Sequence, residues 1–352
     1  MSIVSINQAG AANNQALRTA LALSLLTGIG VDFEGLKDDN PRPRPGLGKA
    51  SLNLLAAVAR SCQGQFQGVV GEERASFTPG VFQYTDYTLS LSALRFSEAP
   101  LSWLLETMVP ALCALEQPVS ILASGGGTHV FGGPTSEEVN QLILPLWSRM
   151  GLAVDFLEIA PGFHPNASGE VEISISPSKH KKPLELTAAF KPVRLGVDAV
   201  IADLPVYLAE QAMEAVASRL SRYGFQTETS LRQPMSGHGQ GLLVWADNGQ
   251  WRVGFSIMGR KGARLDTLAG QAVEELLSFL KSGASLPAHQ ALYCLLPAIL
   301  APAHSRILVD KVDSALKAAI RVLDKFYPET VSLAGTGTGA ILHIKGRPPT
   351  RA

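Results

Sequence analysis

The chain carries no surplus of either charge, because 30 lysine and arginine residues balance 30 aspartate and glutamate residues. A net charge of zero excludes a global basic field that would draw the protein to nucleic acid, so any such binding must rest on local patches. Charged residues make up 17% of the 352-residue chain and hydrophobic residues 46%. This composition is typical of a globular protein with a sizeable core.

Cysteine is scarce, and no two cysteines form a C-x-x-C pair. Cys62, Cys113 and Cys294 are widely spaced, and each lies in an apolar helical stretch. This spacing excludes a disulfide framework or a zinc ribbon and predicts buried thiols in a reducing compartment. Residues 1–10 contain neither a basic nor an apolar run, so we expect no secretory signal and a cytoplasmic protein.

Apolar runs suited to a membrane are also missing. The longest, residues 99–123, is interrupted by Glu106, Glu116 and prolines. These interruptions favour a buried helix followed by a strand over a membrane span. We therefore expect no association with a membrane.

A recurring unit is present instead, in which a helix-period run meets glycine or proline and passes into a β-branched or aromatic strand. Glycine is favoured where a helix ends, and proline stops a helix soon after its end. The four instances join 20–27 to 31–34, 142–150 to 154–159, 215–223 to 225–229 and 318–326 to 331–333. Such repeats predict an α/β (α+β) protein assembled from similar modules.

The segment 176–183 is polar, basic and flanked by proline, as linkers are. Beyond it, 184–278 contains strand-like runs and a helical run at 208–223. We predict a small inserted α/β domain at 184–278 and a large domain formed by 1–183 and 279–352. Near the end of the chain, three alternating glycines lie between strand-like flanks with no helix after them, which predicts a hairpin turn and not a nucleotide loop.

An arginine loop, defined here as residues 41–47, precedes an apolar helical run. Its prolines fix an extended backbone that presents Arg42 and Arg44, and Lys49 follows. Guanidinium groups on such a loop suit a phosphate group. The alternative is an ordinary solvated surface loop.

Four further segments follow a fixed order with the arginine loop. They are Gly10-Ala-Ala-Asn-Asn-Gln15-Ala-Leu-Arg18, Ser124-Gly-Gly-Gly-Thr128, Gly162-Phe-His-Pro165 and Met258-Gly-Arg-Lys-Gly262. In this order and spacing the chain resembles the RNA 3′-terminal phosphate cyclases, from about Ile3 to His343. The resemblance implies a large domain of repeated βαβαββ-type units interrupted by a smaller inserted α/β domain.

The resemblance also implies a reaction. In the family, a histidine attacks the α-phosphate of ATP and carries AMP to an RNA 3′-phosphate, and the neighbouring 2′-hydroxyl then displaces it to leave a 2′,3′-cyclic phosphate. The chemistry uses Mg²⁺ or Mn²⁺ with carboxylate support and cations that hold the terminal phosphate. The corresponding phosphate-binding positions here are Gln15, Arg18, Arg42, Arg44 and Lys49, with Arg260 and Lys261 as additional cations. The nucleotide-binding positions, if that function is retained, are Gly126, Gly127, Thr128, Phe163 and Pro165.

The chain departs from the family where the chemistry is most demanding. Ala315 stands at the position of the nucleophilic histidine, in the segment Val312-Asp-Ser-Ala-Leu-Lys317. A methyl group has no lone pair, so no adenylylated enzyme can form there. His304 is the nearest upstream histidine, but the strand-like run 307–309 intervenes, and we interpret it as a surface or loop histidine. We therefore assign no catalytic residue.

Other chemical positions have changed as well. The replacements are Ala11 for a glutamate, Ser51 for a histidine, His129 for an acidic residue, Asp266 for a glutamate and Leu292-Tyr293 for an Asp-Gln pair. A neutral histidine weakens the binding of hard metals, which prefer oxygen ligands.

Three hypotheses remain open. The first is a catalytically degenerate cyclase-like protein that binds RNA ends or structured RNA in RNA processing, without a required cofactor. The second is an active ATP-dependent cyclase with a relocated nucleophile, which would need ATP and Mg²⁺ or Mn²⁺. The third is a non-RNA binding scaffold on the same fold, which binds a small molecule or only proteins. Protein partners or a homo-oligomer are compatible with each hypothesis.

Overall fold

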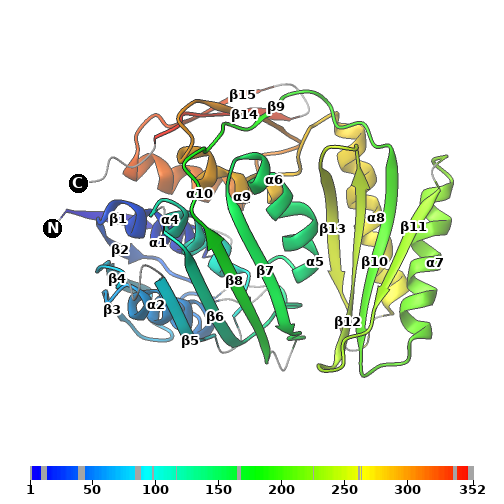
Figure 1. Ribbon diagram of the computed structural model, residues 1–352, viewed down its shortest axis with the longest axis horizontal. Helices are drawn as coiled ribbons and strands as arrows, with labels where there is room; N and C mark the ends of the chain where they lie inside the picture. Colours follow the sequence, from blue (N-terminus) through cyan, green and yellow to red (C-terminus); the bar gives the residue numbers. More distant parts are fainter. Residues whose placement is uncertain are drawn as a thin grey trace.

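The computed structural model describes residues 2–8, 14–38, 44–83, 89–96, 99–115, 117–164, 168–224, 226–260, 262, 264–335 and 339–347. Within these residues the strands form four sheets of four strands each (Figure 1). Helices and sheets alternate along the chain, so the predicted mixed α/β class is confirmed.

The first unit has the element order βαβαββ. Its elements are β1 (Ile3–Asn7), α1 (Gln15–Thr27), β2 (Gly30–Glu34), α2 (Lys49–Ser61), β3 (Gln65–Gly68) and β4 (Arg74–Thr78). The sheet order is β1-β2-β4-β3, with β1 parallel to β2 and the other pairs antiparallel. Strand β1 is therefore an edge strand.

The second unit repeats this topology with broken helices. Its elements are β5 (Leu89–Arg95), α3 (Trp103–Thr107), α4 (Val109–Cys113), β6 (Val119–Gly126), α5 (Ser136–Glu138), the π-helix η1 (Val139–Ile143), α6 (Leu144–Arg149), β7 (Ala153–Ala160) and β8 (Gly169–Ser176). The order β5-β6-β8-β7 matches that of the first sheet, and β5 is again parallel to its neighbour β6.

The third unit has the same order but is interrupted after its first strand. It contains β9 (Glu185–Leu186), α9 (Ala288–Ile299), β14 (Ser305–Val309), α10 (Ser314–Phe326), β15 (Val331–Gly335) and β16 (Ala340–Ile344). Between β9 and α9 run β10 (Arg194–Ala202), α7 (Tyr207–Ser221), β11 (Thr227–Arg232), β12 (Gly239–Asp247), β13 (Arg252–Met258) and α8 (Leu265–Ser282). These form the fourth sheet, in the order β11-β10-β12-β13, on the right in Figure 1. The division at 184–278 stays a prediction, since these observations concern strand pairing and not independent folding.

The predicted helix-to-strand turns are present. Gly28, Gly151 and Gly224 have φ values of 74°, 77° and 82°, and each lies between a helix and the following strand. This left-handed backbone is open to glycine at little steric cost, which is why the repeat was visible in the sequence. The predicted C-terminal hairpin is also found, as the antiparallel pair β15–β16.

Helices of the three units pack against one another, and this packing places the polar groups discussed below. Helix α1 contacts α3, α4 and α10, while α9 contacts α3, α6 and α10. The three cysteines are buried and unpaired, as predicted. No helix within the described part of the chain is long and apolar enough to cross a membrane.

The fourth sheet is anchored to the second unit through η1. Leu142 of η1 packs with Leu243 and Trp245 of β12. The Gln141 amide donates to Asp198 Oδ2 at 2.6 Å and accepts from Arg252 Nη1 at 2.8 Å. Side chains of η1 thus hold β10, β12 and β13 against the second unit.

Candidate functional site

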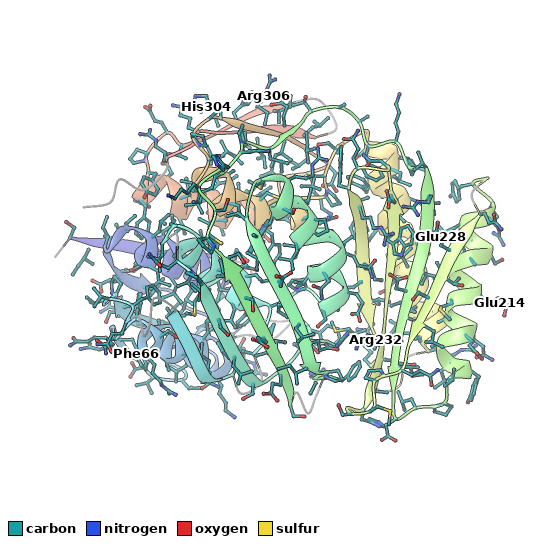
Figure 2. All side chains as sticks on the ribbon, viewed as in Figure 1. Phe66, Glu214, Glu228, Arg232, His304 and Arg306 are labelled. Atoms are coloured by element: carbon teal, nitrogen blue, oxygen red, sulfur yellow. The ribbon has the colours of Figure 1, made fainter. Side chains whose placement is uncertain are left out.

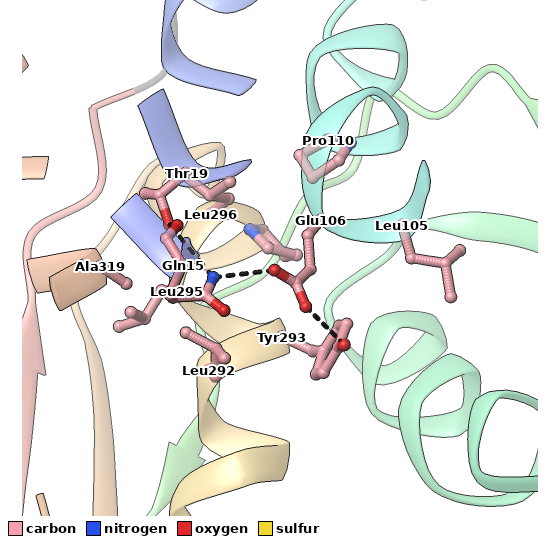
Figure 3. A pocket seen from close by; sticks show the side chains of 11 residues that line it. Gln15, Thr19, Leu105, Glu106, Pro110, Leu292, Tyr293, Leu295, Leu296 and Ala319 are labelled. Carbon is pink, nitrogen blue, oxygen red and sulfur yellow. Dashed lines mark hydrogen bonds between the residues drawn. The ribbon is translucent and has the colours of Figure 1, made fainter. Parts of the chain in front are cut away.

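A buried polar network lies where α1, α3 and α9 meet (Figure 3). Glu106 of α3 accepts hydrogen bonds from Gln15 Nε2 at 2.8 Å, Arg18 Nε at 2.9 Å and the Tyr293 hydroxyl at 2.5 Å. Arg18 also donates to Gln15 Oε1 at 2.5 Å, and its guanidinium lies 4.6 Å from the ring centroid of Trp103. The Arg18 and Glu106 side chains are each only 6% exposed.

The network keeps the Tyr293 hydroxyl protonated. Burial raises the pKa of Tyr293 well above its ordinary value, and the adjacent Glu106 carboxylate raises it further. Tyr293 is therefore a neutral hydrogen-bond donor at neutral pH. Gln15 and Arg18, predicted as phosphate-binding residues, instead bind Glu106 in this structure. Phosphate binding by either would require the network to open.

The cavity beside this network is too small for a nucleotide. It has a volume of about 20 Å³ and is lined by Gln15, Glu106 and Tyr293 together with aliphatic side chains of α9 and with Ala319 of α10. One ordered water needs roughly 10–15 Å³ on the same measure. Ala315 precedes Ala319 by four residues and therefore lies on the same face of α10, one turn closer to the helix start.

His304 lies at the opposite end of β14 from Ala315. It is exposed and directly precedes β14, whereas α10 begins after the other end of that strand, with Asp313 as its N-cap. Five strand residues span roughly 16 Å. Figure 2 shows His304 beside Arg306 on the upper rim of the molecule. This placement gives no support to His304 as a relocated nucleophile.

Asn14 joins the two segments that flank the arginine loop. The Asn14 side chain donates to the Lys37 carbonyl at 2.5 Å and to Ser51 Oγ at 3.1 Å, and it accepts from the Lys37 backbone N–H. Arg44 is exposed, and its backbone N–H donates to Asp38 Oδ1 at 2.8 Å. Lys49 is exposed at the first position of α2. Arg44 is therefore exposed on the arginine loop, and Lys49 is exposed at the start of the following helix.

Several predicted positions fall elsewhere. Arg42, Pro165 and Lys261 lie outside the described residues. Arg260 is exposed, and Asp266 is paired with Arg264 at 2.7 Å.

Four of the predicted nucleotide-binding positions, Gly126, Gly127, Thr128 and Phe163, lie within the described residues and are buried. A Cβ atom on Gly127 would lie 2.1 Å from Val130 Cγ1. Thr128 Oγ1 accepts from the Gly162 N–H at 2.9 Å and is hydrogen bonded to His129 Nδ1 at 2.8 Å. Phe163 stacks on His129 with centroids 4.7 Å apart. Phe163 also packs with Val200 and Ala202 of β10. These residues therefore make contacts within the second unit and to the fourth sheet, and their nucleotide-binding role stays a prediction.

A charged cluster next to His129 was not predicted from the sequence. Arg232 of β11 donates to Glu137 at 2.6 Å and to Glu158 at 2.7 Å, while His129 Nε2 lies 2.7 Å from Glu137. Burial by itself raises the pKa of Glu137, but His129 and Arg232 outweigh it and lower the pKa to about 2. The cluster clamps the fourth sheet to the second unit (Arg232 is labelled in Figure 2). Arg232 lies 95 residues from Glu137 and 74 residues from Glu158 in the chain, so no local sequence pattern predicts these contacts.

Within the described residues no group of three histidine, cysteine, aspartate or glutamate side chains is placed to hold a metal ion. The side chains at the presumed reaction centre also do not match the family chemistry, since Ala315 offers no nucleophile and Leu292 no oxygen ligand. These observations concern the nucleophile and the metal ligands alone, and the expectation that the protein requires no cofactor stays a prediction.

The sheets, their order and the interrupted third unit define an α/β protein built from repeated βαβαββ units. Residues 9–333 match the family "RNA 3'-terminal phosphate cyclase". The chain belongs to this family, and the resemblance inferred from the sequence is confirmed.

Three relatives align with nearly the whole chain. The "RNA 3'-terminal phosphate cyclase" of Methylococcus capsulatus is 31% identical over 96% of this chain and 95% of its own length. Proteins of the same name from Methanopyrus kandleri and Salmonella typhimurium are 28% and 26% identical, each over 95% of this chain and 96% of the relative. Among solved structures, the enolpyruvyl transferase NikO of Streptomyces tendae aligns with a TM-score of 0.26 at 13% identity, covering 97% of this chain and 64% of that one.

Proposed function

We propose that this protein is a cyclase-family member that binds RNA ends or structured RNA in RNA processing and does not form an adenylylated enzyme. The observation that carries the proposal is Ala315 at the start of α10, where the family resemblance implies a histidine. The small cavity next to Ala319 supports it, because its volume of about 20 Å³ leaves space for one water and not for a nucleotide.

The RNA-binding part of the proposal rests on the braced arginine loop. Arg44 and Lys49 are exposed, and Asn14 holds the segments that carry them. Arg18 is assigned a structural role, since its charge is paired with Glu106. The buried, unpaired cysteines support a reducing, cytoplasmic location, which also remains a proposal.

Labelled ATP tests the catalytic half. The protein is incubated with α-labelled ATP and Mg²⁺ or Mn²⁺, and covalent label is measured after denaturation. We expect none in the native protein. The variant Ala315→His is labelled in parallel, because it restores an imidazole at position 315 without changing any residue of the hydrogen-bond network around Glu106. Covalent AMP on the native protein, lost in His304→Ala, would overturn the proposal.

Salt dependence tests the RNA half. Binding of single-stranded RNA ending in a 3′-phosphate is measured across a salt series, with a 3′-hydroxyl RNA as comparison. Each phosphate contact contributes about −0.7 to the slope of log K against log salt. We expect Arg44→Gln and Lys49→Gln each to reduce the slope by about that amount. No binding, or binding that ignores salt, would favour the non-RNA scaffold.

A second candidate is an active ATP-dependent RNA 3′-phosphate cyclase. It is favoured by the relatives, which carry that name and align over nearly the whole chain at up to 31% identity. The labelling experiment decides between the two candidates.

A further inference from the structure

The sheet of the second unit has one face in the core and one face that meets solvent. Helices α4 and α6 contact β8 and β7, and these two strands contribute Phe156, Val171 and Ile173 to the core. The alternate side chains of the same strands are half-buried or exposed. In Figure 1, β6, β8 and β7 lie in front, and no described helix crosses them. We call this solvent side of β6, β8 and β7 the outer face.

Two aliphatic side chains break the polar pattern of the outer face. Leu157 is 58% exposed and Ile159 is 50% exposed, and both belong to the edge strand β7. A sheet with one solvated face normally places apolar residues inward and polar residues outward. Leu122 of β6 is half-buried and lies in the same row as Leu157, with Glu172 between them. Ile159 lies at a bulge opposite Glu170. An apolar row is therefore open to water.

The fold does not require aliphatic residues at these positions. Strands β3 and β15 occupy the same edge position in the sheets of the first and third units as β7 does in the second. The outward residues of β3 are Gln65 and Gln67, and those of β15 are Ser332 and Ala334. Polar or small side chains therefore serve at the equivalent edges. Exposed aliphatic groups on an edge strand are a liability that a partner surface removes.

Three carboxylates lie on the same outer face. Asp155 is outward on β7, and Glu170 and Glu172 are outward on β8. None of the three forms an ion pair with a described residue. Glu172 has a leucine on each side across the strands and therefore no counter-charge beside it. A face with this charge repels phosphate and attracts cations, which disfavours RNA as its occupant.

We propose that the outer face docks a basic amphipathic helix of a partner protein. Apolar residues one turn apart on a helix are about 5–6 Å from each other, and residues two apart on a strand are separated by roughly 6–7 Å. An apolar stripe on the helix therefore matches Leu157 and Ile159. Lysine or arginine beside that stripe pairs with Glu170 and Glu172 on the neighbouring strand, about 4.8 Å away. The proposal goes beyond the proposed function, because it adds a protein partner on a surface outside the arginine loop.

A designed peptide tests the docking chemistry. The probe is a fluorescent helix with leucine at positions i, i+3, i+4 and i+7 and lysine beside them, and binding is measured by anisotropy. A scrambled peptide of the same composition and a version with glutamate in place of lysine are the comparisons. We expect binding of the first peptide alone, with an affinity that falls as salt rises because exposed charges are screened.

Variants of the protein locate the binding of this peptide. Leu157→Ser should weaken it about tenfold and Glu172→Gln about threefold. Val193→Ser and Asp32→Asn are the matched controls, since they change an exposed aliphatic and an exposed carboxylate on other sheets. Both should bind the peptide as the native protein does. Peptide binding that is unchanged in Leu157→Ser, or equal for the scrambled peptide, would refute the proposal.

Crosslinking in the cells that produce the protein identifies the occupant. A photoreactive amino acid replaces Leu157 or, as the control, Val193 in the full chain, and crosslinked segments are sequenced by mass spectrometry. We expect position 157 to capture a segment with basic amphipathic helical spacing. Capture of RNA, of a second copy of this chain or of an acidic segment, or no capture above the level at position 193, overturns the proposal. Leu157→Ser should leave RNA binding through Arg44 unchanged, so failure here is separate from failure of the proposed function.

Discussion

Replacing Glu106 by glutamine should be among the most damaging single changes in the chain. Glu106 is the acceptor for Gln15, Arg18 and Tyr293, and its side chain is 6% exposed. The change leaves the Arg18 guanidinium buried without a counter-charge. Removing one partner of a buried ion pair typically costs about 3–5 kcal/mol. We expect a loss of that size in the free energy of unfolding.

Urea unfolding measures this loss as a shift of the midpoint at unchanged slope. Tyr293→Phe serves as a graded comparison, since it removes one hydrogen bond to a charged acceptor and should cost about 1.5–3 kcal/mol. The double variant Arg18→Met, Glu106→Leu removes both charges and should recover only part of the loss, because the apolar pair leaves no unpaired charge but the Tyr293 hydroxyl and the Gln15 amide lose their acceptor. A Glu106→Gln variant within about 1 kcal/mol of the native protein would refute the reasoning.

Three further predictions concern titration and packing. The pKa of Glu137 is about 2 in the folded protein and 4.5 in the unfolded chain, so its ionised form contributes stability that is complete above about pH 4.5 and is lost as the pH falls through 2. In Glu137→Gln the urea midpoint should therefore depend less on pH between 4.5 and 2 than in the native protein. Burial lowers the pKa of His289 from 6.5 to about 4, so stability declines as the pH falls from 6.5 to 4, and His289→Gln should remove that decline in the same assay. A Cβ atom on Gly239 would lie 2.5 Å from the Phe163 ring, so Gly239→Ala should lower the free energy of unfolding in urea by about 1–3 kcal/mol. In the control Gly241→Ala the new Cβ has no neighbour closer than 3.5 Å, and the loss should be under about 0.5 kcal/mol.

The arginine loop shows what a sequence motif can predict about a site and what it cannot. The sequence predicted exposed cations on a constrained loop, and Arg44 and Lys49 are indeed exposed. It also grouped Arg18 with them, although the tertiary structure pairs Arg18 with Glu106, 88 residues away in the chain. A glutamate within the apolar stretch 99–123 was visible as an interruption. Its partners were not, since nothing local in the sequence relates α3 to α1 and α9.

The glycine-rich segment 124–128 was visible in the sequence, but what its residues contact depends on the fold. Gly127 leaves no room for a side chain, and Thr128 uses its hydroxyl within the second unit. Family resemblance assigned these positions to nucleotide. The structure shows what each touches in this chain, and whether a nucleotide also binds there stays a prediction.

Short-range information alone was enough for the repeated units, because helix period, strand alternation and the glycine between them all act over a few residues. The alanine at position 315 is equally a fact of the sequence, and its match to the family's nucleophile position stays a prediction from the resemblance. Which charges meet, and which face solvent, was decided only when the sheets and helices packed, as Arg232 and its two carboxylate partners illustrate. Electrostatic and packing energies depend on distance in space, and contacts between residues far apart along the chain exist only in the assembled fold.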